Sequence, residues 1–262
     1  MILFVLILIL MVLFWFLRPS TEKFDKHYRV IILVVATDSD FEIKCRDSWK
    51  KYKDLRDDVK VFFVYGKNTS QKISKEDYDL IFDVDESYGS IGTLEKTLQA
   101  IEYINKNYSY DFMLKTNITC MVDFDSLLKR LKDKTPDSFH EGSTCTNLLN
   151  YACGSDMFLS RDVATKFTEG RGKFKPEYWD DQNSGYYLSS VGLPVNFVDN
   201  VCFAMNFKTP DQTEEMNQNI NACKAAGNDV YRVKNTTTDR RSEVDIAYHN
   251  EFIKSVYQYN NV

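Results

Sequence analysis

The sequence predicts an α/β sandwich around a largely parallel sheet, preceded by a transmembrane helix. The segment Arg29–Ala36 (RVIILVVA) is a continuous apolar, mostly β-branched run, which is typical of a strand buried on both faces of a parallel sheet. Strand-like runs then alternate with segments of helical spacing, as where Ser87–Asn105 precedes Phe112–Lys115. The chain also opens with an uninterrupted apolar run, Met1–Leu17.

The apolar run Met1–Leu17 is expected to be a retained membrane anchor, with Trp15 near one interface. No basic region precedes it and no small-residue cleavage site follows it, which argues against a cleaved signal peptide. Residues 18–27 are expected to be a linker, and residues 28–262 a single folded catalytic domain. The predicted placement is a single-pass membrane protein with a lumenal, Golgi- or ER-type domain favoured. The basic residues after the run favour a cytosolic domain instead, so orientation stays open.

The elements that follow the first strand are predicted in turn from apolar spacing and from capping residues. Asp125 is placed to cap the helix that begins at Ser126, and Gly192 is placed to end the helix over 181–191. Residues beyond Lys208 are polar and weakly patterned until the last helix. The expected elements are a helix over 41–55, strands over 59–65 and 80–84, a helix over 92–105, a strand over 112–115, a helix over 126–132, a strand over 153–159, a helix from 160, a helix over 181–191 and a helix over 244–257.

Composition excludes some classes of protein. A net charge of −5 and a pI near 5.4 give no basic surface for a nucleic acid. Six cysteines occur without a CxxC pair, which argues against a zinc site. Disulfides, with Cys145 and Cys153 closing a short loop, and six free buried thiols are both compatible with this spacing.

Acidic pairs are the remaining candidates for chemistry, because no nucleophile elbow, Walker loop, dinucleotide fingerprint or HExxH motif occurs. Of three D-x-D triplets, Asp38-Ser39-Asp40 follows the first strand, and Asp123-Phe124-Asp125 is better explained as a helix cap than as a metal chelate. Asp180-Asp181 follows Trp179 at a helix start. Such a pair can hold a general base at a sugar-sized pocket or can simply cap the helix, and both interpretations stand.

Five blocks between about Asp40 and Val201 together resemble the β-1,3-galactosyltransferase and Fringe-type family of glycosyltransferases. They are Arg46-Asp47-Ser48-Trp49; Tyr78-Asp79-Leu80-Ile81 with Glu86-Ser87-Tyr88 and Lys96-Thr97; Leu114-Lys115-Thr116; Cys153-Gly154 to Leu159-Ser160-Arg161; and Asp180-Asp181-Gln182-Asn183-Ser184-Gly185. The resemblance implies a GT-A fold that transfers a sugar, with inversion, from a nucleotide sugar, expected to be a UDP-sugar, to a glycan or glycoprotein hydroxyl.

Carried over by position, the resemblance makes Asp181, beside Asp180, the general base. Donor-binding roles fall to Thr37, Asp38, Arg46, Trp49, Lys115, Asn117 and Thr119, and acceptor-side roles to Gly154, Ser155 and Trp179.

The chain departs from this family at its metal motif. Where the family has three aspartates, this chain has Asn117-Ile118-Thr119, and no histidine lies just after Asp181. No metal ligand is therefore predicted. Mn²⁺ remains a possible cofactor, but its usual ligands are absent. A metal-independent transferase needs other cations for the leaving diphosphate, and the candidates are Lys115, Arg161, Arg232, Lys234, Arg240 and Arg241. The alternative functions are a catalytically inactive sugar- or partner-binding domain and a membrane-tethered structural protein.

Overall fold

The computed structural model describes residues 26–67, 75–85, 90–144 and 151–258. In chain order, the elements are β1 (His27–Val35), α2 (Asp40–Lys50), β2 (Val59–Tyr65), β3 (Asp79–Ile81), α3 (Ser90–Asn107), β4 (Ser109–Asn117), β5 (Cys120–Val122), α4 (Phe124–Leu131), β6 (His140–Gly142), β7 (Met157–Ser160), α5 (Arg161–Glu169), η3 (Arg171–Lys173), α6 (Asp180–Ser190), β8 (Asn196–Phe197), β9 (Val201–Ala204), α7 (Thr213–Ala225), β10 (Val230–Val233) and α8 (Arg241–Tyr257).

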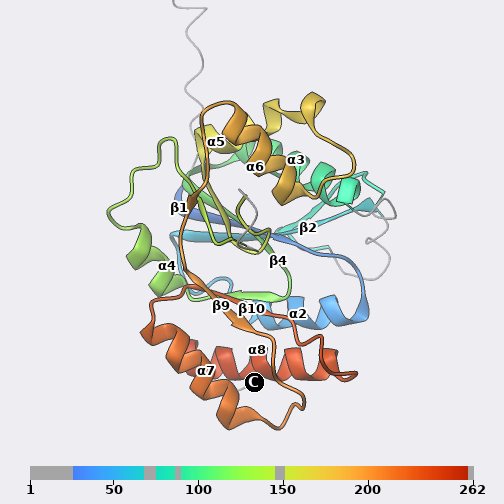
Figure 1. Cartoon of the computed structure of the whole chain (residues 1–262), viewed down its shortest axis with the longest axis vertical. Helices are drawn as coiled ribbons and strands as arrows, with labels where there is room; N and C mark the ends of the chain where they lie inside the picture. The colour runs from blue at the N-terminus through green and yellow to red at the C-terminus, as the bar shows by residue number, and fades with distance from the viewer. Residues whose placement is uncertain (1–25, 68–74, 86–89, 145–150, 259–262) are drawn as a thin grey trace, which may run out of the picture.

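The main sheet has seven strands in the order β3-β2-β1-β4-β7-β6-β8 among the described residues. β1 pairs in parallel with β2 and with β4, whereas β7 runs antiparallel to β4. Helices α3, α5 and α6 cover one face, and α2, α7 and α8 lie on the other side (Figure 1). The predicted α/β sandwich around a mainly parallel sheet is therefore confirmed.

The two faces of β1 explain why its sequence is apolar without alternation. Val30, Ile32 and Val34 pack into the core beneath α2 and α8, whereas Ile31 and Leu33 pack into the core beneath α3 and α5. All five side chains are completely buried. A strand covered on both faces needs apolar residues at every position, as its sequence predicted.

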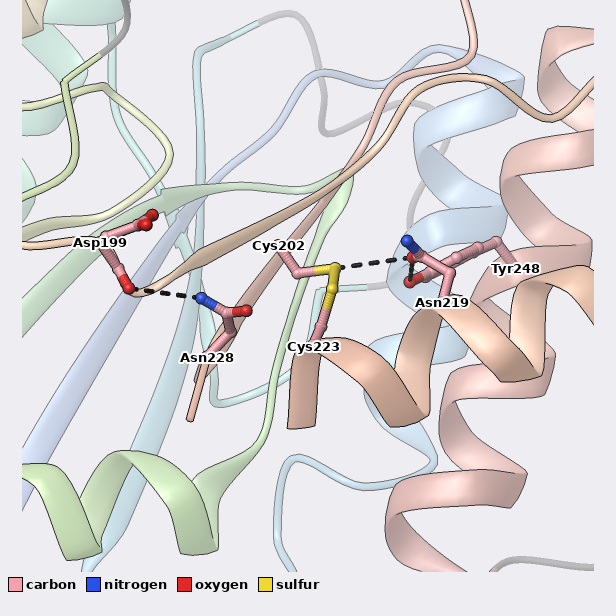
Figure 2. Close-up of a disulfide and its surroundings, with 6 residues drawn as sticks. All are labelled: Asp199, Cys202, Asn219, Cys223, Asn228 and Tyr248. Atoms are coloured by element: carbon pink, nitrogen blue, oxygen red, sulfur yellow. Dashed lines mark hydrogen bonds between the residues drawn. A yellow bond between two sulfur atoms is a disulfide. The ribbon is translucent and has the colours of Figure 1, made fainter. Parts of the chain in front are cut away.

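A small second sheet, β5-β10-β9, lies between the main sheet and α8 (Figure 1). β10 pairs antiparallel with β5 and parallel with β9. The disulfide Cys202–Cys223 joins β9 to α7, and beside it Tyr248 Oη donates a hydrogen bond of 2.8 Å to Asn219 Oδ1 (Figure 2). Of these elements, α7 and β10 lie in the part beyond Lys208 for which the sequence predicted no element.

The expectation of six free thiols is wrong. In addition to the Cys202–Cys223 pair, Cys153 is disulfide-bonded, while Cys45 and Cys120 are free and buried. The predicted pairing of Cys153 with Cys145 involves a residue outside the described ranges.

The cap predicted at Asp125 belongs to Asp123. Asp123 Oδ1 accepts hydrogen bonds of 3.1 Å from the backbone amides of both Asp125 and Ser126. The helix α4 begins two residues earlier than expected because Phe124 is fully buried in the core. Strand β7 likewise begins at Met157 rather than at Cys153.

The predicted placement as a single-pass membrane protein is corrected. No helix in the described part of the chain is both long enough and apolar enough to cross a bilayer. The segment Met1–Leu17, on which that prediction was based, lies outside the described residues.

Candidate active site

A cavity of about 520 Å³ opens at the carboxyl ends of β1 and β4. The two strands are parallel neighbours, with Val35 opposite Asn117. From β1 the chain proceeds outward to β2 and β3 and then returns to β4 on the other side of β1. This is the topological switch point of the sheet, where α/β proteins bind ligands because the connections on either side diverge. The lining residues are Val35, Ala36, Thr37, Glu42, Thr93, Lys96, Lys115, Asn117, Ile118, Thr119, Gly154, Trp179, Asp180, Asp181, Arg232, Lys234 and Arg241.

The turn Asn117–Thr119 is fixed through its backbone. Ile118 N donates to Val35 O at 3.0 Å, and Trp49 Nε1 donates to Ile118 O at 3.2 Å. His249 Nε2 donates to Thr119 O at 3.3 Å, which the tautomer with a proton on that nitrogen allows. Burial lowers the pKa of His249 to about 4, so it is neutral near pH 7. The backbone of this turn is therefore held while Asn117 and Thr119 line the cavity.

The acidic pair enters the cavity from the first turn of α6. Lys115 Nζ lies 2.6 Å from Asp180 Oδ2, and both side chains are buried. Because Asp180 Oδ2 has no partner in hydrogen-bond geometry among the described residues, this contact is an ion pair without a well-directed hydrogen bond. The same ammonium donates to Gly154 O at 3.0 Å. Lys115 thus links the end of β4, the loop before β7 and the start of α6.

Asp181 is held at both carboxylate oxygens. Its Oδ2 accepts from Gly154 N at 3.0 Å, and its Oδ1 accepts from Gln182 N at 2.8 Å. Burial, with a smaller contribution from the negative charge of Asp180, raises the pKa of Asp181 above its ordinary value, and Lys115 opposes this rise. A carboxylate with a raised pKa is a stronger base than a solvated aspartate, and its position at the cavity wall suits it to accept a proton from a bound hydroxyl.

Basic side chains line much of the rest of the cavity. Arg232 comes from β10 and Arg241 from the start of α8, on the opposite side of the main sheet from α6 (Figure 1). Arg232 Nη1 donates to Ser155 Oγ at 3.3 Å, and Arg241 Nε donates to Asp245 Oδ2 at 3.2 Å. Neither Arg232 nor Lys234 is ion-paired with a carboxylate within the described ranges. These positive charges can bind an anionic group within the cavity.

The donor set does not fit a divalent metal ion. Asp180 is neutralised by Lys115, and both oxygens of Asp181 accept backbone hydrogen bonds. The remaining acidic lining residue, Glu42, accepts a hydrogen bond from Thr37 N. Hard cations prefer several anionic oxygens that converge on one point, and among the described residues no group of three or more His, Cys, Asp or Glu side chains is arranged in this way.

Most of the residues predicted from the sequence meet in this cavity. Its lining includes Thr37, Lys115, Asn117, Thr119, Gly154, Trp179, Asp180 and Asp181. Arg232, Lys234 and Arg241, which the sequence offered only as candidate cations, are also there.

Four predicted residues do not line the cavity. Arg46 forms a buried pair with Asp79, with Nη2 at 2.6 Å from Oδ2. Trp49 supports the Ile118 carbonyl from behind, and Ser155 holds Arg232. The fourth, Asp38, lies in the connection between β1 and α2.

Two candidate cations lie elsewhere. Arg161 donates to the carbonyls of Asn105 and Tyr108, and Arg240 pairs with Glu243.

Sequence reasoning missed Glu42, Thr93 and Lys96 as lining residues. Lys96 is buried on α3, where its Nζ donates to Ala36 O at 2.7 Å. Lys96 appeared in the sequence analysis only within a block of the family resemblance, and its burial could not be predicted because lysine side chains are mostly exposed.

No family model matches this chain, and no curated protein sequence matches it either. Among solved structures, the chain is similar to the apo structure of the bifunctional glycosyltransferase WbbM, with a TM-score of 0.45 and 13% sequence identity. The match covers 93% of this chain and 51% of that chain, so this chain spans about half of the length of that neighbour. A likeness of this extent carries no argument about function, and the sequence resemblance to the Fringe-type family stays a prediction.

Proposed function

We propose that this protein is an inverting glycosyltransferase that moves a sugar from a nucleotide sugar, expected to be a UDP-sugar, to a hydroxyl of a glycan or glycoprotein. The observation that carries the proposal is the position of Asp181 in the switch-point cavity. It is a fixed carboxylate with a raised pKa, and basic side chains line the same cavity. The five sequence blocks that resemble Fringe-type glycosyltransferases support the same assignment.

In the proposed reaction, Asp181 accepts the proton of the acceptor hydroxyl as its oxygen attacks the anomeric carbon of the donor. The bond between that carbon and the diphosphate breaks on the opposite side, so the configuration inverts. The diphosphate leaves with its negative charge facing Arg232, Lys234 and Arg241. Fixed positive charges stabilise such a leaving group without having to reorganise during the reaction.

Metal independence is part of the proposal. Its support is the neutral Asn117-Ile118-Thr119 turn together with the basic lining of the cavity. Turnover is expected to be insensitive to a chelator, and a strict requirement for Mn²⁺ would exclude this part of the proposal.

Asp181→Asn tests the assignment of the base. The amide keeps the size of the side chain but cannot accept the proton, so we expect kcat to fall by about two to four orders of magnitude. The assay is sugar transfer across a panel of nucleotide sugars, with and without metal. Near-wild-type transfer by the variant would rule out Asp181 as the base.

A catalytically inactive sugar-binding domain is the second candidate, and the loss of carboxylates at Asn117–Thr119 favours it. The two candidates separate in the same assay. A binder retains nucleotide sugar in equilibrium binding but shows neither transfer nor hydrolysis with any donor of the panel.

A further inference from the structure

A second cleft, of about 400 Å³, is lined by residues of α6 and of the segment that precedes it. Half of its lining residues are aromatic: Phe174, Tyr178, Tyr186 and Tyr187. Lys173, Lys175, Asn183 and Ser190 complete the lining. Both cavities fall within the range of about 300 to 1,000 Å³ that is usual for small-molecule sites.

The cleft and the active-site cavity are lined by consecutive residues of the chain. The run Tyr178-Trp179-Asp180-Asp181 connects the two, because Tyr178 lines the cleft and the next three residues line the active-site cavity. Trp179 is 54% exposed and Tyr186 is 45% exposed. The ring of Tyr151 packs in the same region, with its centroid 6.0 Å from that of Tyr186. Exposed aromatic rings therefore extend from the base outward along α6.

The cleft is preformed, because a buried asparagine fixes its rim. Asn183 Oδ1 accepts from Lys175 N at 2.8 Å, and Asn183 Nδ2 donates to the carbonyls of Lys175 and Tyr178 at 3.0 Å each. Asn183 is only two residues beyond Asp181. The rim of the cleft and the proposed base are thus held on the same turn of α6, so their relative positions are fixed.

Two of the aromatic rings that line the cleft, Phe174 and Tyr187, pack closely over Gly170. Phe174 and Tyr187 pack edge to face, with centroids 5.7 Å apart and an interplanar angle of 84°. A Cβ at Gly170 would lie 2.6 Å from the Tyr187 ring and 2.7 Å from the Phe174 ring. Only a residue without a side chain allows these two rings to meet there.

We infer that this cleft binds the sugar ring next to the acceptor sugar, so that the acceptor is an oligosaccharide of at least two rings. This inference rests on the proposed function. A pyranose has an apolar face of C–H bonds and an edge of hydroxyl groups. Aromatic walls fit the first, and the tyrosine hydroxyls and the ammonium of Lys175 fit the second. Lys175 Nζ lies over the Tyr178 ring, 4.9 Å from its centroid, so a hydrogen-bond donor stands at one face of that ring.

The test is binding of the labelled full chain to a glycan array without any donor, followed by titration of the retained glycans and their constituent monosaccharides. We expect retention only of glycans with two or more rings. Tyr186→Ala should weaken this binding by about tenfold, because it removes an exposed stacking face. Tyr186→Phe keeps the stacking ring and removes only the hydroxyl, so its loss should be smaller than that of Tyr186→Ala. Tyr103→Ala removes a similarly exposed tyrosine from α3, outside the cleft, and should bind within about twofold of wild type.

Three results would overturn the inference: retention of no glycan, equal retention by Tyr186→Ala and wild type, or equally tight binding of the monosaccharides. Preferential retention of unglycosylated peptide would indicate a peptide groove and would also overturn it. Loss of UDP binding in Tyr186→Ala would place the nucleotide in this cleft instead.

Failure of the proposed function is distinguishable, because the array requires neither donor nor turnover. Asp181→Asn should keep glycan binding while losing transfer. If it keeps transfer, the assignment of the base fails, and the cleft is still judged by Tyr186→Ala alone.

Discussion

Lys115 Nζ lies 2.6 Å from Asp180 Oδ2, and this ion pair joins the end of β4 to the start of α6 inside the cavity. The exposed fraction is 2% for the lysine side chain and 6% for the aspartate side chain. The pair places a positive charge beside Asp181 at the end of the strand where the resembled family carries its aspartates. It also makes the stability of the fold depend on the site.

Replacing Lys115 with Met should lower the free energy of unfolding by about 3 to 5 kcal/mol, because Asp180 is left buried without a counter-charge. Urea unfolding monitored by circular dichroism measures this. The double variant Lys115→Met/Asp180→Leu removes both charges and should recover most of the loss. A loss below about 1 kcal/mol in the single variant would mean that the pair behaves like a solvated surface pair.

Transfer activity should fall as pH decreases, because Asp181 must be ionised to accept a proton. Since burial and Asp180 raise the pKa of Asp181, the midpoint of the acid limb of kcat/KM should lie above the ordinary aspartate value of about 3.9. Asp180→Asn removes the neighbouring negative charge and leaves Lys115 unneutralised. Both effects should move the midpoint to lower pH. An unchanged or higher midpoint in pH-rate profiles would contradict this electrostatic account.

Gly154→Ala should reduce kcat while the protein stays folded. A Cβ at this position would lie 3.1 Å from both Asp181 Oδ2 and Lys115 Nζ, so one of them must shift by a few tenths of an ångström. A displaced base costs about tenfold in rate. Gly172→Ala is the matched control, because its Cβ would meet no atom within 4 Å. If the two variants have equal rates, the close packing at Gly154 does not matter to catalysis.

Asp156 should make stability depend on pH in an unusual direction. Burial raises the pKa of Asp156 to about 7, although hydrogen bonds from Ser143 N and Ser143 Oγ oppose this. The folded state therefore binds the proton more tightly than the unfolded state does. This contribution to stability is fully present below about pH 4 and is lost as pH rises through about 7.

The measurement is urea unfolding of wild type and Asp156→Asn between pH 4 and pH 8. The variant should gain stability relative to wild type as pH rises, by an amount on the order of 4 kcal/mol. The opposite effect of His249, whose pKa is lowered to about 4, is common to both proteins and cancels in the difference. A difference that is flat across this range would contradict the prediction.

The local sequence determined the helices and strands that have a regular pattern of buried apolar side chains. Strand β2 was predicted with its observed bounds, and β1, β4, α3 and α8 within a few residues, because apolar side chains recur there at every position or at helical spacing. It also determined that Asp180 and Asp181 begin a helix next to Trp179. These patterns need no information about distant parts of the chain, because each results from burial of the element's own residues.

Tertiary structure alone decided which residues share the cavity. Arg232 and Arg241 are far from Asp181 in the sequence, so no local pattern predicts that they line the same cavity. Among the described residues, β10 is a short strand that pairs with β5 and β9. Helix α7 has only Met216 and Ile220 fully buried, too few for a periodic signal. Tertiary structure also decided that Lys115 pairs with Asp180, and that Arg46, which was predicted to bind the donor, pairs with Asp79. A charged side chain chooses its partner through long-range packing, which its neighbours in sequence do not reveal.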